Sequence, residues 1–111
     1  MKDGEPTVLR YWDLEFPEQS LSLRDGATAT YRLVEEAVAL CLRGMSPKKT
    51  GAFLSGGTDS STIVGLMGKA TAERVNAFSI GFREPRYNEL HYAEVAARHF
   101  DATHYTATVT A

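Results

Sequence analysis

Three short apolar segments, each preceded by a stretch with helical spacing, constrain the fold of this 111-residue chain more than any other feature. The apolar segments span residues 50–54, 75–82 and 103–109. The helical stretches span residues 27–43, about 59–69 and 88–100. Strands that alternate with helices form βαβ units, in which neighbouring strands run parallel and helices cover the sheet. The sequence therefore predicts an α/β fold with a parallel sheet.

The first helical stretch carries apolar residues at spacings of one, three and four, which is typical of one helix face. This stripe consists of Leu33, Val34, Ala37, Val38 and Cys41. Gly44 and Pro47 end the pattern. The stripe predicts that Cys41 is a small residue of the core. Residues 22–26 have the composition of a turn, which divides the chain into an N-terminal arm or linker, residues 1–26, and a domain, residues 27–111.

The N-terminal arm contains one aromatic pair, Tyr11 and Trp12. Aromatic side chains bury a large apolar area when they pack against a core. We therefore expect the pair to anchor the arm on the domain. The alternative is that the pair forms a docking strip for a neighbouring domain.

The composition excludes several classes of protein. A formal net charge of −2 provides no basic surface for a nucleic acid backbone. The sequence has no apolar run of about 18 residues to span a membrane and no signal-peptide core near its start. The single cysteine, Cys41, excludes an internal disulfide and a cysteine zinc cluster. These features indicate a cytoplasmic protein that binds neither nucleic acid nor membrane.

A glycine-rich turn lies between the first predicted strand and the helix that follows, where open α/β sheets bind ligands. Its residues are Ser55, Gly56, Gly57, Thr58, Asp59, Ser60 and Ser61. Glycines let backbone N–H groups approach an anion, and a helix N-terminus attracts negative charge. The turn lacks the Gly-Lys-Ser/Thr of a Walker A loop. It therefore predicts a polyphosphate site in which Asp59 binds a metal ion, because a carboxylate beside phosphates needs a cation between them.

The string from Ser55 to Ser60 matches the pyrophosphate-binding loop Ser-Gly-Gly-x-Asp-Ser of the ATP pyrophosphatases at every fixed position. Residues 11–14, 78–82 and 87–100 resemble the glutamine-hydrolysing asparagine synthetases, and the resemblance runs from about residue 8 to 109. It implies a three-layer, adenine nucleotide alpha hydrolase-like (Rossmann-like) fold. Residues 27–111 would be the N-terminal part of the ATP-binding synthetase domain.

The resemblance also implies which residues bind ligands. The pyrophosphate end of ATP would be held by Ser55, Gly56, Gly57, Asp59 and Ser60. Asp59 would also reach Mg²⁺, and Leu54 and Ile80 would border the adenosine. No catalytic residue for the adenylation step is identified in this sequence.

In the intact family, the side-chain carboxylate of aspartate attacks the α-phosphate of ATP and pyrophosphate is released. Ammonia from glutamine, produced in a separate glutaminase domain, then displaces AMP to give asparagine. Thr58 stands where leucine is common in asparagine synthetases, and Asn88 where aspartate is frequent. Adenylation of another carboxylate, as in β-lactam synthetases and peptide cyclases, therefore remains open.

The chain ends directly after a predicted strand, without a helix to cover it. We therefore expect only part of the full domain and half of the site, with a chain inactive by itself. Apolar surface that the remainder would cover is then exposed, which predicts self-association.

Three alternatives compete with this interpretation. Serine, glycine and aspartate are also ordinary turn and cap formers. A non-catalytic nucleotide-binding module would keep the loop without chemistry. A serine hydrolase would use Ser79, since residues 77–81 imitate a Gly-x-Ser-x-Gly elbow, with His91, His99 or His104 as the base. An elbow leads directly into a helix, however, and a loop is predicted at residues 82–85.

Overall fold

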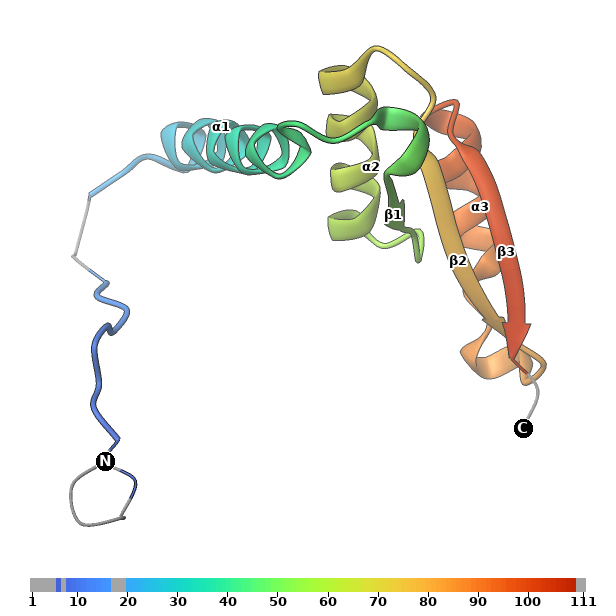
Figure 1. The fold of residues 1–111 in the computed structure, drawn as a ribbon, viewed down its shortest axis with the longest axis horizontal. Helices are drawn as coiled ribbons and strands as arrows, with labels where there is room; N and C mark the ends of the chain where they lie inside the picture. The colour runs from blue at the N-terminus through green and yellow to red at the C-terminus, as the bar shows by residue number, and fades with distance from the viewer. Residues whose placement is uncertain (1–5, 7, 17–19, 110–111) are drawn as a thin grey trace.

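The computed structural model describes residues 6, 8–16 and 20–109 (Figure 1). Helices and strands alternate along the chain as the sequence predicts. Their order is α1 (Leu23–Leu42), the 3₁₀ helix η1 (Pro47–Lys49), β1 (Gly51–Phe53), α2 (Thr58–Thr71), β2 (Asn76–Phe82), the 3₁₀ helix η2 (Pro85–Tyr87), α3 (Leu90–His99) and β3 (Thr103–Val109).

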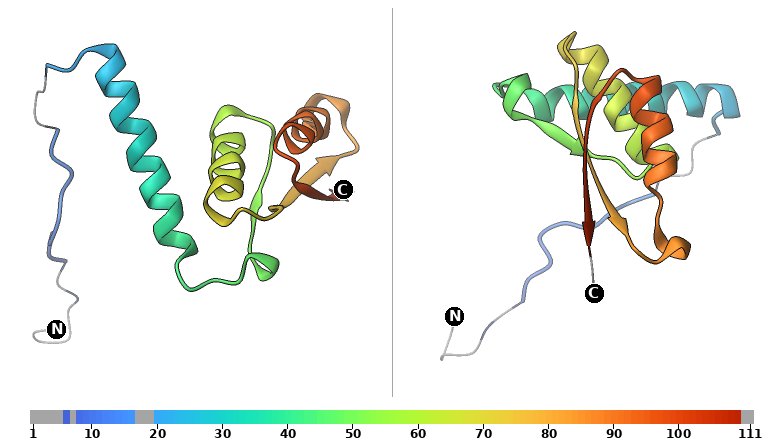
Figure 2. Two further views of the ribbon diagram at one scale, coloured as in Figure 1. Left: turned by 90° about the horizontal axis from the view of Figure 1, so that it is seen from above. Right: turned by 90° about the vertical axis from the view of Figure 1, so that its right-hand side faces the viewer.

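The three strands form one parallel sheet in the order β1-β2-β3. The register places Phe53 beside Phe78, and Phe78 beside Tyr105. Helices α2 and α3 lie on the same face of this sheet (Figure 2). The prediction of a Rossmann-like α/β fold is confirmed. Of the three layers of that fold, the described residues form two, the sheet and one layer of helices.

The core lies between the sheet and helices α2 and α3. Val64 of α2, Ala77 of β2 and Ala93 of α3 have no exposed surface. Small residues at two of these positions let the helix and the strands approach closely. The other buried apolar residues are Val38, Leu54, Leu66, Met67, Val75 and Ala97.

The opposite face of the sheet carries exposed apolar side chains. Burial alternates along β2, because successive side chains of a strand point to opposite faces. Phe78, Ile80 and Phe82 lie on the exposed side. The ring of Phe78 stacks on that of Tyr105, with 5.2 Å between centroids. We name the exposed side chains Phe53, Phe78, Ile80, Phe82 and Tyr105 the open face.

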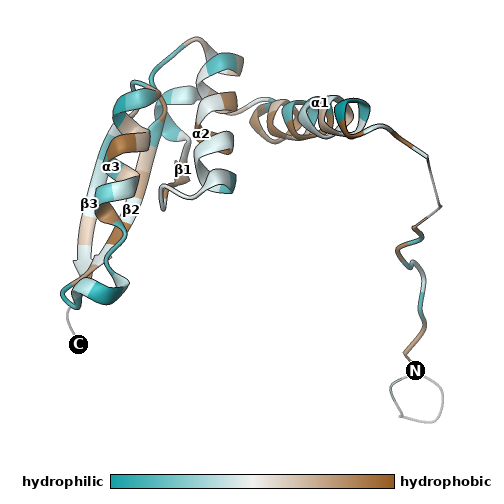
Figure 3. Ribbon diagram, turned by 180° about the vertical axis from the view of Figure 1, so that it is seen from behind, coloured by the Kyte–Doolittle hydropathy of each residue, from teal (hydrophilic) through white to brown (hydrophobic). Residues whose placement is uncertain are grey.

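Helix α1 carries apolar residues along much of its length (Figure 3) and contacts α2. Lys69 Nζ of α2 lies 2.6 Å from Glu35 Oε1 of α1 and donates to the Tyr31 hydroxyl at 3.3 Å. The hydrogen bond to Glu35, followed by that to Tyr31, raises the pKa of Lys69. A groove of about 510 Å³ separates α1 from α2 and β1. Cys41 lines this groove and is exposed, so the prediction that it is a core residue is wrong.

Two helix boundaries differ from the sequence prediction. Helix α1 begins at Leu23, and Ser22 Oγ accepts a hydrogen bond from the Asp25 N–H at 3.1 Å. The interpretation of residues 22–26 as a turn is therefore wrong. The helical stretch predicted over residues 88–100 begins at Leu90 as helix α3, with Glu89 as its N-cap. The Asn88 side chain still accepts from the N–H of Leu90 at 3.2 Å.

Helix α3 buries a different face from the one that its larger apolar residues predict. Ala93 and Ala97 point into the core, whereas Tyr92, Val95 and His99 are exposed. Gly56 in the neighbouring loop lies against the α3 backbone, where even a Cβ would not fit. Close packing therefore overrides side-chain size in selecting the buried face.

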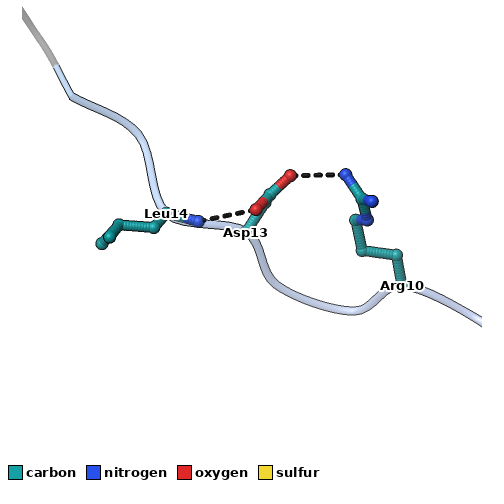
Figure 4. A network of polar contacts seen from close by, with 3 residues as sticks. All are labelled: Arg10, Asp13 and Leu14. Atoms are coloured by element: carbon teal, nitrogen blue, oxygen red, sulfur yellow. Dashed lines mark hydrogen bonds and ion pairs between the residues drawn. The ribbon is translucent and has the colours of Figure 1, made fainter.

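Within the N-terminal arm, residues 6, 8–16 and 20–26 are described, and the last four of these belong to α1. Tyr11 is 98% exposed and Trp12 is 69% exposed. The prediction that this pair anchors the arm on the core is therefore wrong. The local structure there is polar, since Arg10 pairs with Asp13, which also accepts from the Leu14 N–H at 2.9 Å (Figure 4). Across the described ranges, no helix has the length and apolar character to cross a membrane.

Candidate phosphate and nucleotide site

The predicted phosphate loop follows β1 directly. The N–H of buried Leu54 donates to Phe78 O at 2.8 Å, which continues the pairing of β1 with β2 beyond Phe53. Helix α2 begins at Thr58, with Gly57 as its N-cap. The turn between strand and helix thus consists of Ser55, Gly56 and Gly57 at the carboxyl end of β1.

The two glycines of the turn have different structural roles. Gly56 has φ +86°, and a Cβ at this position would lie 2.3 Å from the carbonyl carbon of Tyr92 and 2.5 Å from Ala93 N. Gly57 has φ −70°, and a Cβ there would meet nothing closer than Ser55 Oγ at 3.4 Å. The fold therefore requires glycine at position 56, while the space beside Gly57 is open.

Two serines hold the loop in shape. Ser60 Oγ accepts from the N–H of Ser55 at 3.2 Å and lies 3.0 Å from Ser55 Oγ. Ser55 Oγ in turn accepts from the N–H of Gly57 at 3.3 Å. These contacts join the end of β1 to the first turn of α2 and fix the path of the glycines.

Within the described part of the chain, no side chain caps the N-terminus of α2, in contrast to α1. The first N–H groups of a helix have no partner within the helix and carry the positive end of its dipole. Asp59 lies in this first turn and is exposed. Among the described residues, no group of three or more histidine, cysteine or acidic side chains could hold a metal ion. Asp59 by itself offers one carboxylate at this helix terminus.

An apolar cavity of about 200 Å³ adjoins the loop. It brings together three of the predicted site residues, Leu54, Ser55 and Ile80. Of the remaining predicted residues, Gly56 and Gly57 lie in the turn itself, and Asp59 and Ser60 lie in the first turn of α2. The cavity is also lined by Phe53, Phe78, Ser79, Phe82, Tyr87, Glu89, Leu90 and Ala93. All seven predicted residues thus belong to one region at the carboxyl edge of β1 and β2.

A polar contact lies beneath this region, between two residues that the sequence named together only in the serine hydrolase alternative, Ser79 and His104. Ser79, which is 5% exposed, donates from Oγ to the carbonyl oxygen of Leu54. His104 Nε2 lies 2.7 Å from the same Oγ. The two residues are 25 positions apart, and the parallel register of β2 and β3 brings them together. The sequence offered His91, His99 and His104 alike as partners of Ser79, and only the strand register selects His104.

The geometry of Ser79 disagrees with the serine hydrolase alternative. Ser79 lies within β2, three residues before its end, and α3 starts only at Leu90, so no elbow surrounds it. Its single hydroxyl proton is donated to Leu54 O, which leaves His104 Nε2 to donate rather than accept. Gly81 is explained by packing, because a Cβ there would lie 2.3 Å from Leu90 Cδ1.

Comparisons with known proteins agree with this geometry. The family model described as asparagine synthase matches residues 29–111, more than half of the chain. A protein of Methanocaldococcus jannaschii named "Putative asparagine synthetase (glutamine-hydrolyzing) 2" is 35% identical over 96 residues. That match covers 86% of this chain and 18% of the relative, so the chain spans less than a fifth of the relative's length.

Proposed function

This chain belongs to the asparagine synthase family, and we propose that residues 55–60 and the adjoining cavity bind ATP in an ATP-dependent, amide-forming ligase. The observation that carries this proposal is the adjacency of two unlike surfaces. The uncapped N-terminus of α2 favours an anion, and the cavity beside it is lined by Leu54 and Ile80. ATP has the same division into a charged polyphosphate and a largely apolar base.

In the proposed complex, the N–H groups of the first turn of α2 donate to the pyrophosphate end of ATP. The hydroxyl groups of Ser55 and Ser60 keep the loop in the conformation that exposes those N–H groups. Gly57 leaves space for the phosphates at the helix N-terminus. Leu54 and Ile80 border the adenosine.

The donor set of this loop fits Mg²⁺ bound together with phosphates. Asp59 is exposed on the same helix turn, and Mg²⁺ in nucleotide sites takes one or two carboxylates together with phosphate and water oxygens. When bound, the ion would offset the charge of the phosphates and make pyrophosphate a better leaving group. Residues 55–60 contain no lysine or arginine that could offset the phosphate charge instead.

The proposed reaction has two steps. A side-chain carboxylate oxygen of aspartate attacks the α-phosphorus of ATP, the bond to the bridging oxygen breaks, and pyrophosphate leaves. The nitrogen of ammonia then attacks the acyl carbon, AMP leaves with the former carboxylate oxygen, and one proton is released. The ammonia would come from glutamine in a glutaminase domain of the intact protein. The family match and the name of the relative support this reaction.

Within that protein, residues 27–111 would be the N-terminal part of the synthetase domain, with residues 1–26 as a linker. We propose that the chain contributes the phosphate side of the site, and that the pocket for the carboxylate is formed elsewhere.

Asp59→Asn tests the proposed site directly. Calorimetric titration of the chain with ATP and with pyrophosphate is expected to detect weak binding that requires Mg²⁺. Loss of a metal ligand should weaken this binding by about tenfold or more. The fold should persist, because Asp59 is exposed in the first turn of α2 and loss of a favourable charge there costs only about 0.3–1 kcal/mol.

The matched control is Glu36→Gln, which removes a carboxylate from the exposed surface of α1, where Glu36 pairs with Arg32. This variant should bind magnesium-ATP like the parent. Equal affinity of Asp59→Asn and the parent would contradict the assignment of Asp59, and absence of pyrophosphate binding by the parent would contradict the loop assignment.

A second expectation concerns turnover by the chain alone. No residue of the adenylation step is identified in it, so we expect no asparagine from aspartate, ATP and ammonia. Detection of asparagine by amino-acid analysis, above the level in a protein-free sample, would show that the residues present suffice for catalysis.

A further inference from the structure

A line of hydrogen bonds crosses the three strands directly beneath the proposed phosphate loop. It runs from His104 on β3 through Ser79 on β2 to the carbonyl oxygen of Leu54 at the end of β1. Leu54 is the residue that precedes the loop, and its N–H is bonded to Phe78 O. Both polar groups of the Leu54 backbone are therefore held by β2.

The protons of this line can be assigned by counting donors. A carbonyl oxygen only accepts, so the one hydroxyl proton of Ser79 lies toward Leu54 O. The lone pairs of Ser79 Oγ then face His104, and Nε2 must carry a proton to bond there at 2.7 Å. Neutral His104 is thereby fixed in the Nε2–H tautomer, and the imidazolium form keeps the same bond.

We propose that Ser79 and His104 are positioning residues that fix the Leu54 carbonyl and thus the start of the phosphate loop. The proposal rests on the ATP-binding function proposed above, but it also makes a prediction for the unliganded chain. Ser79 is buried at 5% exposure, where an unpaired hydroxyl or carbonyl is unfavourable, so the bonded arrangement is strongly preferred. The next residue, Ser55, is tied in turn to Ser60 of α2. Displacement of Leu54 would therefore be transmitted to the N-terminus of α2.

Three variants separate positioning from general stability. Ser79→Ala breaks the line at its centre. His104→Leu removes the terminal donor, whereas His104→Gln keeps an N–H donor at the position equivalent to Nε2 and cannot titrate. If the line positions the loop, Ser79→Ala and His104→Leu should each weaken magnesium-pyrophosphate binding by about tenfold, the effect of one buried hydrogen bond. His104→Gln should bind magnesium-pyrophosphate within about twofold of the parent. The double variant Ser79→Ala with His104→Leu should bind it like the single variants, because either change alone already breaks the same chain of hydrogen bonds.

Two measurements do not depend on ligand binding. Amide hydrogen exchange followed by NMR should quicken at Leu54, Ser55 and Gly57 in Ser79→Ala and His104→Leu, but not in His104→Gln. The ¹⁵N shifts of the His104 ring, assigned by their loss in His104→Gln, should show a proton on Nε2 in the neutral form.

Each outcome decides between the two proposals. If the parent binds no pyrophosphate but the exchange pattern is as expected, the function is wrong and the positioning role stands. If the parent binds and Ser79→Ala binds equally well with unchanged exchange at residues 54–57, the positioning role is wrong. A neutral His104 protonated on Nδ1 would also overturn it, because Nε2 would then be an acceptor.

Discussion

The two glycines of the loop are equivalent in the sequence motif but not in the structure. Gly56 has a positive φ, and its α-carbon faces the backbone of α3 so closely that no side chain fits. Gly57 has an ordinary φ and open space at its α-carbon. The fold therefore depends on Gly56, and the proposed ligand depends on Gly57.

Gly56→Ala is expected to destabilise the chain by about 2 kcal/mol or more, because a Cβ would force the loop away from Tyr92 and Ala93 in addition to the strain of a positive φ. Gly57→Ala should cost clearly less, about 0.5–1 kcal/mol, because its φ is ordinary and its surroundings are open, and only the poorer N-cap preference of alanine counts against it. Urea denaturation followed by circular dichroism measures both. Equal losses for the two variants would show that the loop does not pack on α3 in this way.

At the scale of the element, serine, aspartate and glycine can form either a turn or a helix start. Residues 22–26 contain all three, and their composition suggested a turn. In the structure, Ser22 is the N-cap of α1 and Asp25 lies in its first turn. A carboxylate there interacts favourably with the positive end of the helix dipole. The helix thus begins before its apolar stripe does.

Ser22→Ala should shorten α1 from its N-terminus and cost about 0.5–2 kcal/mol, the usual effect of losing a capping hydroxyl. Faster amide exchange at Asp25 is the most direct measurement. Ser20→Ala is the matched control, since Ser20 precedes the helix and is exposed. If the control exchanges as fast at Asp25 as Ser22→Ala does, the cap assignment is wrong.

Local features of this fold could be predicted from the sequence, whereas contacts set by close packing and by strand register could not. The strands and the loop were predictable because apolar runs and the Ser-Gly-Gly-x-Asp-Ser string are local signals. The inward face of α3 was not, because Ala93 and Ala97 are buried by close packing rather than by hydrophobicity. The contact of Ser79 with His104 depends on the register of two strands that are distant in sequence, and no local spacing encodes that register.

At the scale of the whole molecule, the described helices cover one face of the sheet and leave the other open (Figure 2). Phe53 and Ile80 on the open face are 75% and 51% exposed. Both residues also line the proposed nucleotide cavity. Exposed apolar area of this kind is normally buried against a partner surface. The open face therefore combines a proposed ligand site with a surface prone to association.

We expect the chain to self-associate through the open face as its concentration rises, because burial of apolar side chains favours association. Size-exclusion chromatography with light scattering should show a mass above the 12.2 kDa of the monomer. Phe53→Gln should shift the mass toward the monomer, since Phe53 lies on the edge strand β1 and contributes little to the core. Leu40→Gln is the control, because Leu40 is 62% exposed but belongs to α1. A parent that stays monomeric at all concentrations, or a control that shifts as far as Phe53→Gln, would show that the open face does not drive association.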